Sequence, residues 1–129
     1  MSKRAPEDIE FDADDLAEVL EHLGKADRNR LSFGVVLMSH SGDVLFYSDH
    51  EREMSGYPRD PVGLNWLRDV APCMNEDWFL NGLIRSRDLG RLDLVVSTTG
   101  DHRDRRQELD LRLLSAVSGQ QMWLLIRRA

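Results

Sequence analysis

Hydrophobic residues near the amino terminus recur at helical spacing. In the stretch FDADDLAEVLEHLGK they fall at positions i, i+3, i+4 and i+7, which lie on one face of a helix. The residues of this face are Leu16, Val19, Leu20 and Leu23. Asp12 or Asp14 suits the start of such a helix, and Gly24 stands where a glycine commonly ends one. We predict an amphipathic helix over residues 14–23.

The chain then changes to patterns typical of strands. SFGVVLM and VLFYS, separated by the turn SHSGD, predict a β-hairpin over residues 32–48. Glycines and prolines between residues 50 and 67 predict only brief helical turns there. The stretch NEDWFLNGLIRSRDLG predicts one helix over residues 75–90, with Asn75 as its cap and Gly90 as its stop.

Three more strands are predicted in the last third of the chain. They cover residues 92–99, 108–114 and 121–128. The second of them alternates strictly and places one set of leucines on one face: Leu109, Leu111 and Leu113. Strands on both sides of a helical middle indicate an α+β fold with an antiparallel sheet.

Composition narrows the classes of protein that fit. The 129 residues are 41% hydrophobic and 31% charged, which suits one globular domain. A net charge of −6 argues against nucleic-acid binding, which draws on Lys and Arg. We also expect no membrane span, because a span needs roughly 20 apolar residues, and no secretory signal. The expected location is the cytoplasm.

Charge is spread unevenly between the two ends of the chain. Residues 1–30 hold nine acidic and five basic residues, whereas residues 101–129 hold four acidic and six basic residues. The two ends therefore carry opposite net charges, and we expect them to attract each other.

The candidate chemistry centres on one thiol. Cys73, in DVAPC, is the single cysteine, so no internal disulfide forms, and the four histidines are not spaced with it as metal ligands. A lone cysteine among apolar neighbours is most often a small buried hydrophobe. Tyr47, Glu51 and Ser55 follow one another at four-residue intervals, so their polar groups converge if the segment is helical. No nucleophile with a base and an orienting acid stands out, and we expect no enzyme activity.

Three segments together resemble a known family. LSFGVVLM, SGDVLFYSDHEREMSG and VGLNWLRDVAPC are similar to the photoactive yellow protein family, a branch of the PAS domains. The resemblance runs from about Phe11 to the last strand and is densest between Leu31 and Cys73. It implies a PAS fold: a five-stranded antiparallel sheet with short helices on one face and an N-terminal helical cap. Residues 1–30 would form this cap and residues 31–129 the PAS core.

The resemblance also implies a cofactor and the residues that hold it. In the family the cysteine of this motif carries p-coumaric acid (4-hydroxycinnamic acid) as a thioester, which assigns the attachment to Cys73. Tyr47 and Glu51 correspond to the groups that hydrogen-bond the phenolic oxygen, Glu51 in its protonated form. Ser55 stands where the family usually has a Thr that bonds the tyrosine. The neighbours Val70 and Ala71 complete the apolar surroundings of the thiol.

The function implied is blue-light reception. Light isomerises the chromophore from trans to cis, Glu51 gives up its proton, and the buried carboxylate that remains loosens the N-terminal cap. No output domain is expected within the 129 residues, so an unidentified signalling protein would read the change. We expect a monomer or a weak homodimer that binds neither nucleic acid nor membrane.

Several positions depart from the family pattern. Tyr57 stands where an Arg usually covers the chromophore, and Gly100, His102 and Asp104 stand where large apolar residues are usual. These changes keep an alternative open. In that alternative the chain is a PAS-type interaction or small-ligand sensing module without a chromophore, and Cys73 is simply buried.

Overall fold

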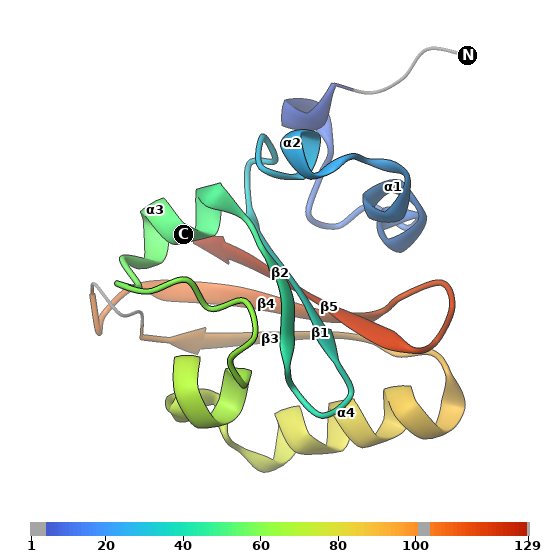
Figure 1. The fold of residues 1–129 in the computed structure, drawn as a ribbon, viewed down its shortest axis with the longest axis vertical. Coiled ribbons are helices and arrows are strands. Elements are labelled where there is room, and N and C mark those ends of the chain that lie inside the picture. Colours follow the sequence, from blue (N-terminus) through green and yellow to red (C-terminus); the bar gives the residue numbers. More distant parts are fainter. Residues whose placement is uncertain (1–4, 101–103, 129) are drawn as a thin grey trace.

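The fold is built on one antiparallel sheet of five strands, as a computed structural model that describes residues 5–100 and 104–128 shows (Figure 1). The strand order is β2-β1-β5-β4-β3, so the strand that comes last in the sequence lies in the middle. The strands are β1 (Gly34–Ser39), β2 (Val44–Tyr47), β3 (Asp93–Thr99), β4 (Glu108–Ser115) and β5 (Gln121–Arg128). The predicted α+β class and five-stranded antiparallel sheet are confirmed.

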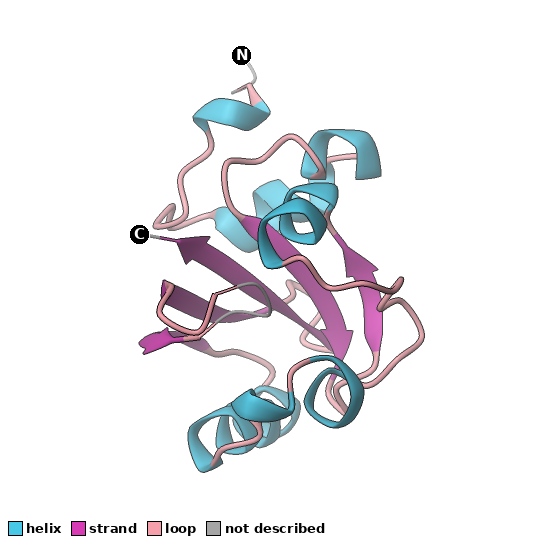
Figure 2. Ribbon diagram, turned by 90° about the vertical axis from the view of Figure 1, so that its left-hand side faces the viewer, coloured by secondary structure: helices cyan, strands magenta, loops and turns pink. Residues whose placement is uncertain are grey.

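Helices cover both faces of this sheet (Figures 1 and 2). Short N-terminal helices lie on one face, and the middle of the chain lies mainly on the other. The helices are η1 (Pro6–Asp8), α1 (Leu16–His22), α2 (Lys25–Arg28), α3 (Asp49–Ser55), η2 (Trp66–Val70), η3 (Pro72–Met74) and α4 (Asp77–Leu89). None of these helices, all within the described residues, is long and apolar enough to cross a membrane.

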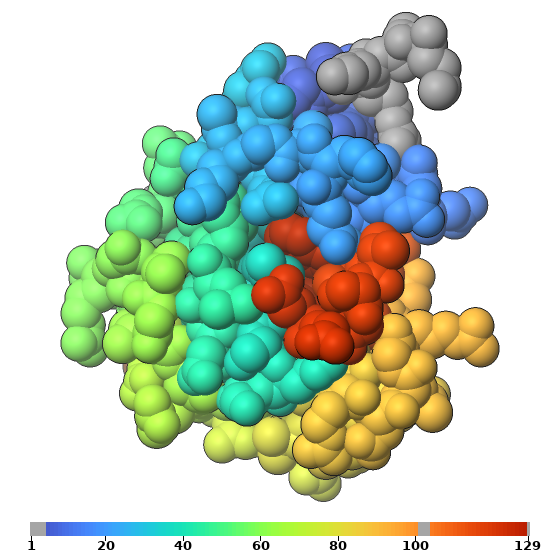
Figure 3. All heavy atoms as spheres, turned by 45° about the vertical axis from the view of Figure 1, so that its right-hand side comes forward, coloured from blue at the N-terminus to red at the C-terminus, as the bar shows by residue number. Residues whose placement is uncertain are grey.

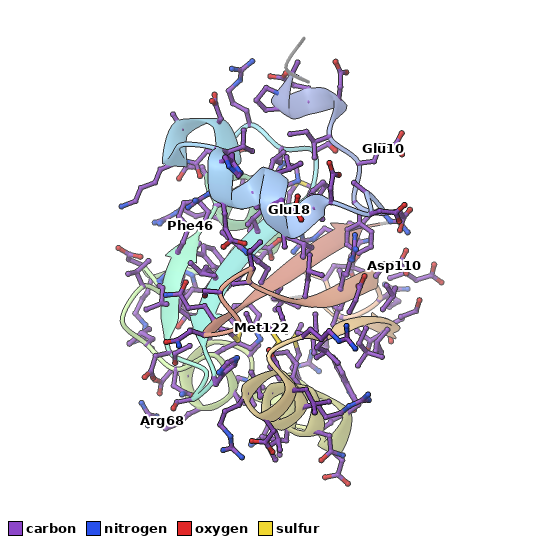
Figure 4. The ribbon with its side chains drawn as sticks, turned by 90° about the vertical axis from the view of Figure 1, so that its right-hand side faces the viewer. Glu10, Glu18, Phe46, Arg68, Asp110 and Met122 are labelled. Carbon is purple, nitrogen blue, oxygen red and sulfur yellow. The ribbon has the colours of Figure 1, made fainter. Side chains whose placement is uncertain are left out.

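The central strand β5 divides the interior into two cores. Because successive side chains of a strand point to opposite faces, its apolar residues separate into two sets. Met122, Leu124 and Ile126 belong to the core beneath α4, whereas Trp123 and Leu125 belong to the core beneath the N-terminal helices. Figure 4 shows the same division, with Met122 toward α4 and Phe46 of β2 beneath the N-terminal helices.

The N-terminal helix α1 docks through the predicted face. Leu16 and Leu20 are fully buried, and Val19 and Leu23 pack at the margin of the same core. The helix is shorter than predicted, by two residues at its start and one at its end, a common difference at frayed helix ends. Asp15 rather than Asp12 or Asp14 occupies the N-cap, and Leu23 rather than Gly24 occupies the C-cap. In Figure 3 the N-terminal segment, in blue, covers the upper part of this face and borders the β1–β2 segment and the C-terminal end of the chain.

The predicted long helix is α4. Gly90 ends it in the left-handed conformation, at φ 72°, as predicted. The predicted cap is wrong: Glu76, not Asn75, is the N-cap residue, because Asn75 closes the preceding η3 turn.

Candidate functional site

The short helix α3 places two buried polar side chains on one face. Ser48 caps the helix: its hydroxyl accepts hydrogen bonds from the backbone N–H groups of Glu51 and Val35, at 3.2 and 3.0 Å. The cap joins the helix to β1 and fixes its direction. Glu51 and Ser55, four residues apart, are 2% and 1% exposed and point into the protein.

Tyr47 meets this face from the end of β2. Its hydroxyl lies 2.8 Å from the hydroxyl of Ser55, and Ser55 also accepts a bond from the backbone N–H of Tyr57 at 3.2 Å. The hydroxyl groups of Tyr47 and Ser55 therefore meet beside the helix that also buries Glu51.

Cys73 lies in the η3 turn that follows the Ala71-Pro72 step. Its side chain is exposed, so the alternative in which Cys73 is simply a buried hydrophobe is wrong. The physical reason is local: Pro72 starts a single tight turn, which leaves only Met74 of that turn buried.

One cavity of about 380 Å³ connects these groups. This volume is in the usual range of small-molecule sites, about 300–1,000 Å³. Tyr47, Glu51 and Cys73 all line it, although they come from β2, α3 and η3. The other lining residues are Trp66, Ala71, Met74, Thr99, Gly100, Arg105, Leu109, Ile126 and Arg128.

Glu51 has a partner that the sequence did not suggest. Arg128, at the end of β5, donates from Nη1 and Nη2 to the two carboxylate oxygens of Glu51, at 2.7 Å each. The side chain of Arg128 is only 7% exposed and that of Glu51 only 3%. A two-point ion pair of this kind favours the ionised carboxyl over the protonated form expected from the family resemblance.

The close approach of Glu51 to β1 depends on a glycine. A Cβ atom added to Gly34 would lie 2.9 Å from Cδ of Glu51, closer than real Cβ atoms approach. The backbone of β1 is therefore open where the carboxyl group rests.

The remaining predicted residues are distributed as follows. Ala71 and Gly100 line the cavity, whereas Val70 is buried in the apolar core. Tyr57 is also buried, and its hydroxyl donates to the backbone oxygen of Asp69 at 3.5 Å, outside the set of lining residues. His102 lies outside the described residues.

Two arginines of the cavity were missed by reasoning from the sequence. Nothing in the sequence context of Arg105 marks it as a cavity residue. Arg128 did carry a signal, because Met122, Leu124 and Ile126 alternate onto the buried face and Arg128 continues their series. A charged residue in phase with a buried face needs a buried partner.

The residues present fit an aromatic acid held by the thiol. Cys73 offers the sulfur, Tyr47 and Glu51 offer polar groups elsewhere in the cavity, and the lining between them includes the apolar side chains of Leu109 and Ile126. Trp66, also in the lining, has its buried Nε1 without a hydrogen-bond partner in the part of the chain that the structure describes. Within the described ranges, no three His, Cys, Asp or Glu side chains gather as metal ligands.

Comparisons with known proteins agree on one kind of relative. The chain is 26% identical over 121 residues to the photoactive yellow proteins of Rhodothalassium salexigens and Halochromatium salexigens, covering 93% of this chain and 97% of each relative. No protein-family model matches.

Solved structures show the same fold. The photoactive yellow protein domain of a sensor histidine kinase from Rhodospirillum centenum superposes with a TM-score of 0.75, at 24% identity, over 86% of this chain and 98% of that domain. A PAS domain from a two-component sensor histidine kinase gives a TM-score of 0.55 at 14% identity, over 88% of this chain and 99% of that one.

Proposed function

We propose that this chain, a relative of the photoactive yellow proteins within the PAS superfamily, is a blue-light photoreceptor that carries p-coumaric acid as a thioester on Cys73. One observation carries the proposal: the single cysteine is exposed and lines the same cavity as the buried Tyr47 and Glu51. The names of the relatives describe a photoactive protein and not an enzyme.

The residues of the chain divide the work of binding. The Cys73 thiolate attacks the acyl carbon of an activated p-coumaroyl donor, and the activating group leaves with the electron pair of its bond. Tyr47 donates a hydrogen bond toward the phenolic oxygen, and Ser55, 2.8 Å away, holds the tyrosine hydroxyl in place. The bound group supplies the absorption of blue light and a trans–cis isomerisation.

Glu51 is the group whose protonation state changes in response to light. Its side chain is shielded from solvent, and gain or loss of a charge there has a large energetic effect. A change at Glu51 acts directly on Arg128, since the two share two hydrogen bonds.

The route to the N-terminal cap runs along β5. Arg127, the neighbour of Arg128, points to the opposite face of the sheet. There its guanidinium lies 4.4 Å from the ring of Phe11 and 3.0 Å from the carboxylate of Asp12. We propose that a shift at the end of β5 weakens these contacts and loosens the cap.

Reconstitution tests the proposal. The purified chain is mixed with the anhydride of p-coumaric acid, and its intact mass and absorption spectrum are recorded. We expect one covalent adduct and a visible band in the wild type, and neither in Cys73→Ser. Glu51→Gln should form the adduct with a shifted band. A wild-type protein without adduct or band contradicts the photoreceptor function.

A second candidate is a PAS-type module that senses a small ligand without a chromophore. Gly100 lines the cavity where the family has a large apolar residue, and the charged Arg105 also lines it. Together they make part of the cavity wall open and polar. Tight binding of a small acid by Cys73→Ser, together with failure of the wild type to form an adduct, would favour this candidate.

We propose a cytoplasmic protein whose change of shape is read by a separate signalling protein, and a monomer or weak homodimer in solution. Sedimentation in the dark and under illumination distinguishes the two oligomeric states.

A further inference from the structure

A buried ion pair lies at the side of the cavity that the family resemblance assigns to the phenolic end of the ligand. Arg128 from β5 and Glu51 from α3 are 77 residues apart in sequence and meet through two hydrogen bonds of 2.7 Å. In Figure 1 the carboxyl end of β5 lies beside α3. Both side chains are more than nine-tenths buried, so water contributes little to either charge.

The charges that line the cavity are not balanced. Two guanidinium groups, Arg105 and Arg128, face one carboxyl group, Glu51. The other titratable side chains in the lining are Tyr47 and Cys73. His50 lies near Arg128: burial is the main cause that lowers the pKa of His50, and the charge of Arg128 lowers it further. Counted over the described lining residues, the cavity therefore has an excess of one positive charge, which favours an anionic ligand.

This chain lacks the arginine that covers the chromophore in the family, so the positive charge for a bound anion has to come from elsewhere in the cavity. The position that usually carries a cation over the chromophore is Tyr57, which is buried and directed to the backbone of Asp69. Of the residues that line the cavity, Arg128 is the cation in direct contact with Glu51. A buried anion requires such a countercharge.

We propose that Arg128 is the counter-cation of the ligand cavity: it holds Glu51 as a carboxylate before the chromophore is attached and balances the ionised phenol afterwards. This inference rests on the proposed function. One proton moves when the site is loaded: the O–H bond of the phenol breaks and an O–H bond forms at Glu51. Arg128 stays positive throughout, so the net charge of the buried site does not change.

Infrared spectroscopy of the chromophore-free protein tests the first half. A protonated carboxylic acid has a C=O stretching band that a carboxylate lacks, and Glu51→Gln identifies the band that belongs to Glu51. At neutral pH we expect no such band in the wild type and a new band in Arg128→Gln, because burial then favours the neutral acid. Arg127→Gln, one residue away on the opposite face, is the matched control and should show no band. A Glu51 band already present in the wild type overturns the proposal.

A double variant covers the case in which Arg128→Gln does not fold. In Arg128→Gln, Glu51 must either stay charged in a buried site or take up a proton at neutral pH, and both cost stability, whereas the double variant has no such carboxyl group. Glu51→Gln/Arg128→Gln should therefore be more stable toward urea than Arg128→Gln. Equal or lower stability of the double variant overturns the proposal.

The loaded protein tests the second half and separates this inference from the proposed function. If the wild type forms no adduct, the proposed function fails while the infrared result on Glu51 and Arg128 stands. In adduct-bearing protein, the visible band follows ionisation of the phenol with pH. We expect its midpoint to rise by about 1–3 units in Arg128→Gln and by less in Arg128→Lys, which keeps the charge. An unchanged midpoint in Arg128→Gln overturns the role of Arg128 toward the ligand.

Discussion

At the scale of single residues, Gly34 sets the position of the Glu51 carboxyl group by having no side chain. A Cβ atom at this position would approach Cδ of Glu51 to 2.9 Å and Cβ of Glu51 to 3.1 Å. Since Glu51 is also tied to Arg128, it cannot move aside without breaking the ion pair.

We predict that Gly34→Ala destabilises the protein by about 1–3 kcal/mol, the usual effect of overpacking a buried site. Urea unfolding measures the change. Gly24→Ala is the matched control, because a Cβ added there meets nothing within 4 Å and φ is −71°. Equal stability of the two variants would show that the carboxyl group of Glu51 does not depend on Gly34.

Ser55 serves two partners with one hydroxyl group. It lies 2.8 Å from the hydroxyl of Tyr47 and accepts a bond from the backbone N–H of Tyr57 at 3.2 Å. We predict that Ser55→Ala costs about 1–3 kcal/mol because buried polar groups lose a partner, and that Ser55→Thr, which keeps the hydroxyl, costs less.

A double-mutant cycle with Tyr47→Phe measures the shared part of this loss. The loss in Ser55→Ala/Tyr47→Phe should be smaller than the sum of the two single losses. Strict additivity would mean that the two hydroxyl groups do not stabilise each other.

At the scale of elements, strand β4 fastens the N-terminal segment through one buried arginine. Arg112 donates from Nη1 to the backbone oxygens of Phe11 and Ala13, at 2.8 and 2.9 Å, and from Nε and Nη2 to Asp93 at 2.8 Å each. The expected attraction between the acidic start and the basic end of the chain is confirmed by a separate contact, Arg127 with Asp12.

We predict that Arg112→Met loosens residues 11–16 without unfolding the sheet. Hydrogen exchange of their amides should become faster. The free energy of unfolding should decrease by at most about 1.5–3 kcal/mol for each hydrogen bond of the guanidinium group that is lost. Arg87→Gln is the control, since Arg87 is 60% exposed and pairs only with its sequence neighbour Asp88 in the described contacts. Unchanged exchange in Arg112→Met would show that apolar packing suffices to hold the segment.

Elements were predictable from the sequence where one local pattern determines them. The leucines of β4 are buried as their alternation indicates, and α4 ends at Gly90. The site was predictable only in part. The four-residue spacing linked Tyr47 to Glu51, and the family resemblance added Cys73. Arg128 meets Glu51 of α3 across 77 residues of sequence, a contact that local spacing does not encode.

At the scale of the whole molecule, two histidines link stability to pH. The pKa values of His40 and His50 are lowered, mainly by burial and further by Arg87 and Arg128 respectively, while Glu53 opposes the shift of His50. His40 also makes a 3.1 Å hydrogen bond to Ser86, which ties the β1–β2 turn to α4.

We predict that the free energy of unfolding decreases as the pH falls through the histidine range. A histidine with a lowered pKa in the folded state is protonated first in the unfolded chain, near its ordinary value of about 6.5. Stability is therefore full above that pH and is lost as the pH falls through the lower folded pKa values. Urea unfolding at a series of pH values measures the loss, and His40→Gln and His50→Gln should each reduce it. A profile that neither variant flattens contradicts the assignment.

The central place of β5 has a consequence for the order in which the fold can form. Strands β1 and β2 pair with each other, as do β3 and β4, and neither pair of strands is bonded to the other pair. Each pair has one edge that only residues 121–128 can cover. During synthesis the ribosome therefore releases two separate pairs of strands before the strand that joins them. Until that strand emerges, Glu51 has no Arg128, the cap has no complete surface to rest on, and both open edges are exposed to other chains.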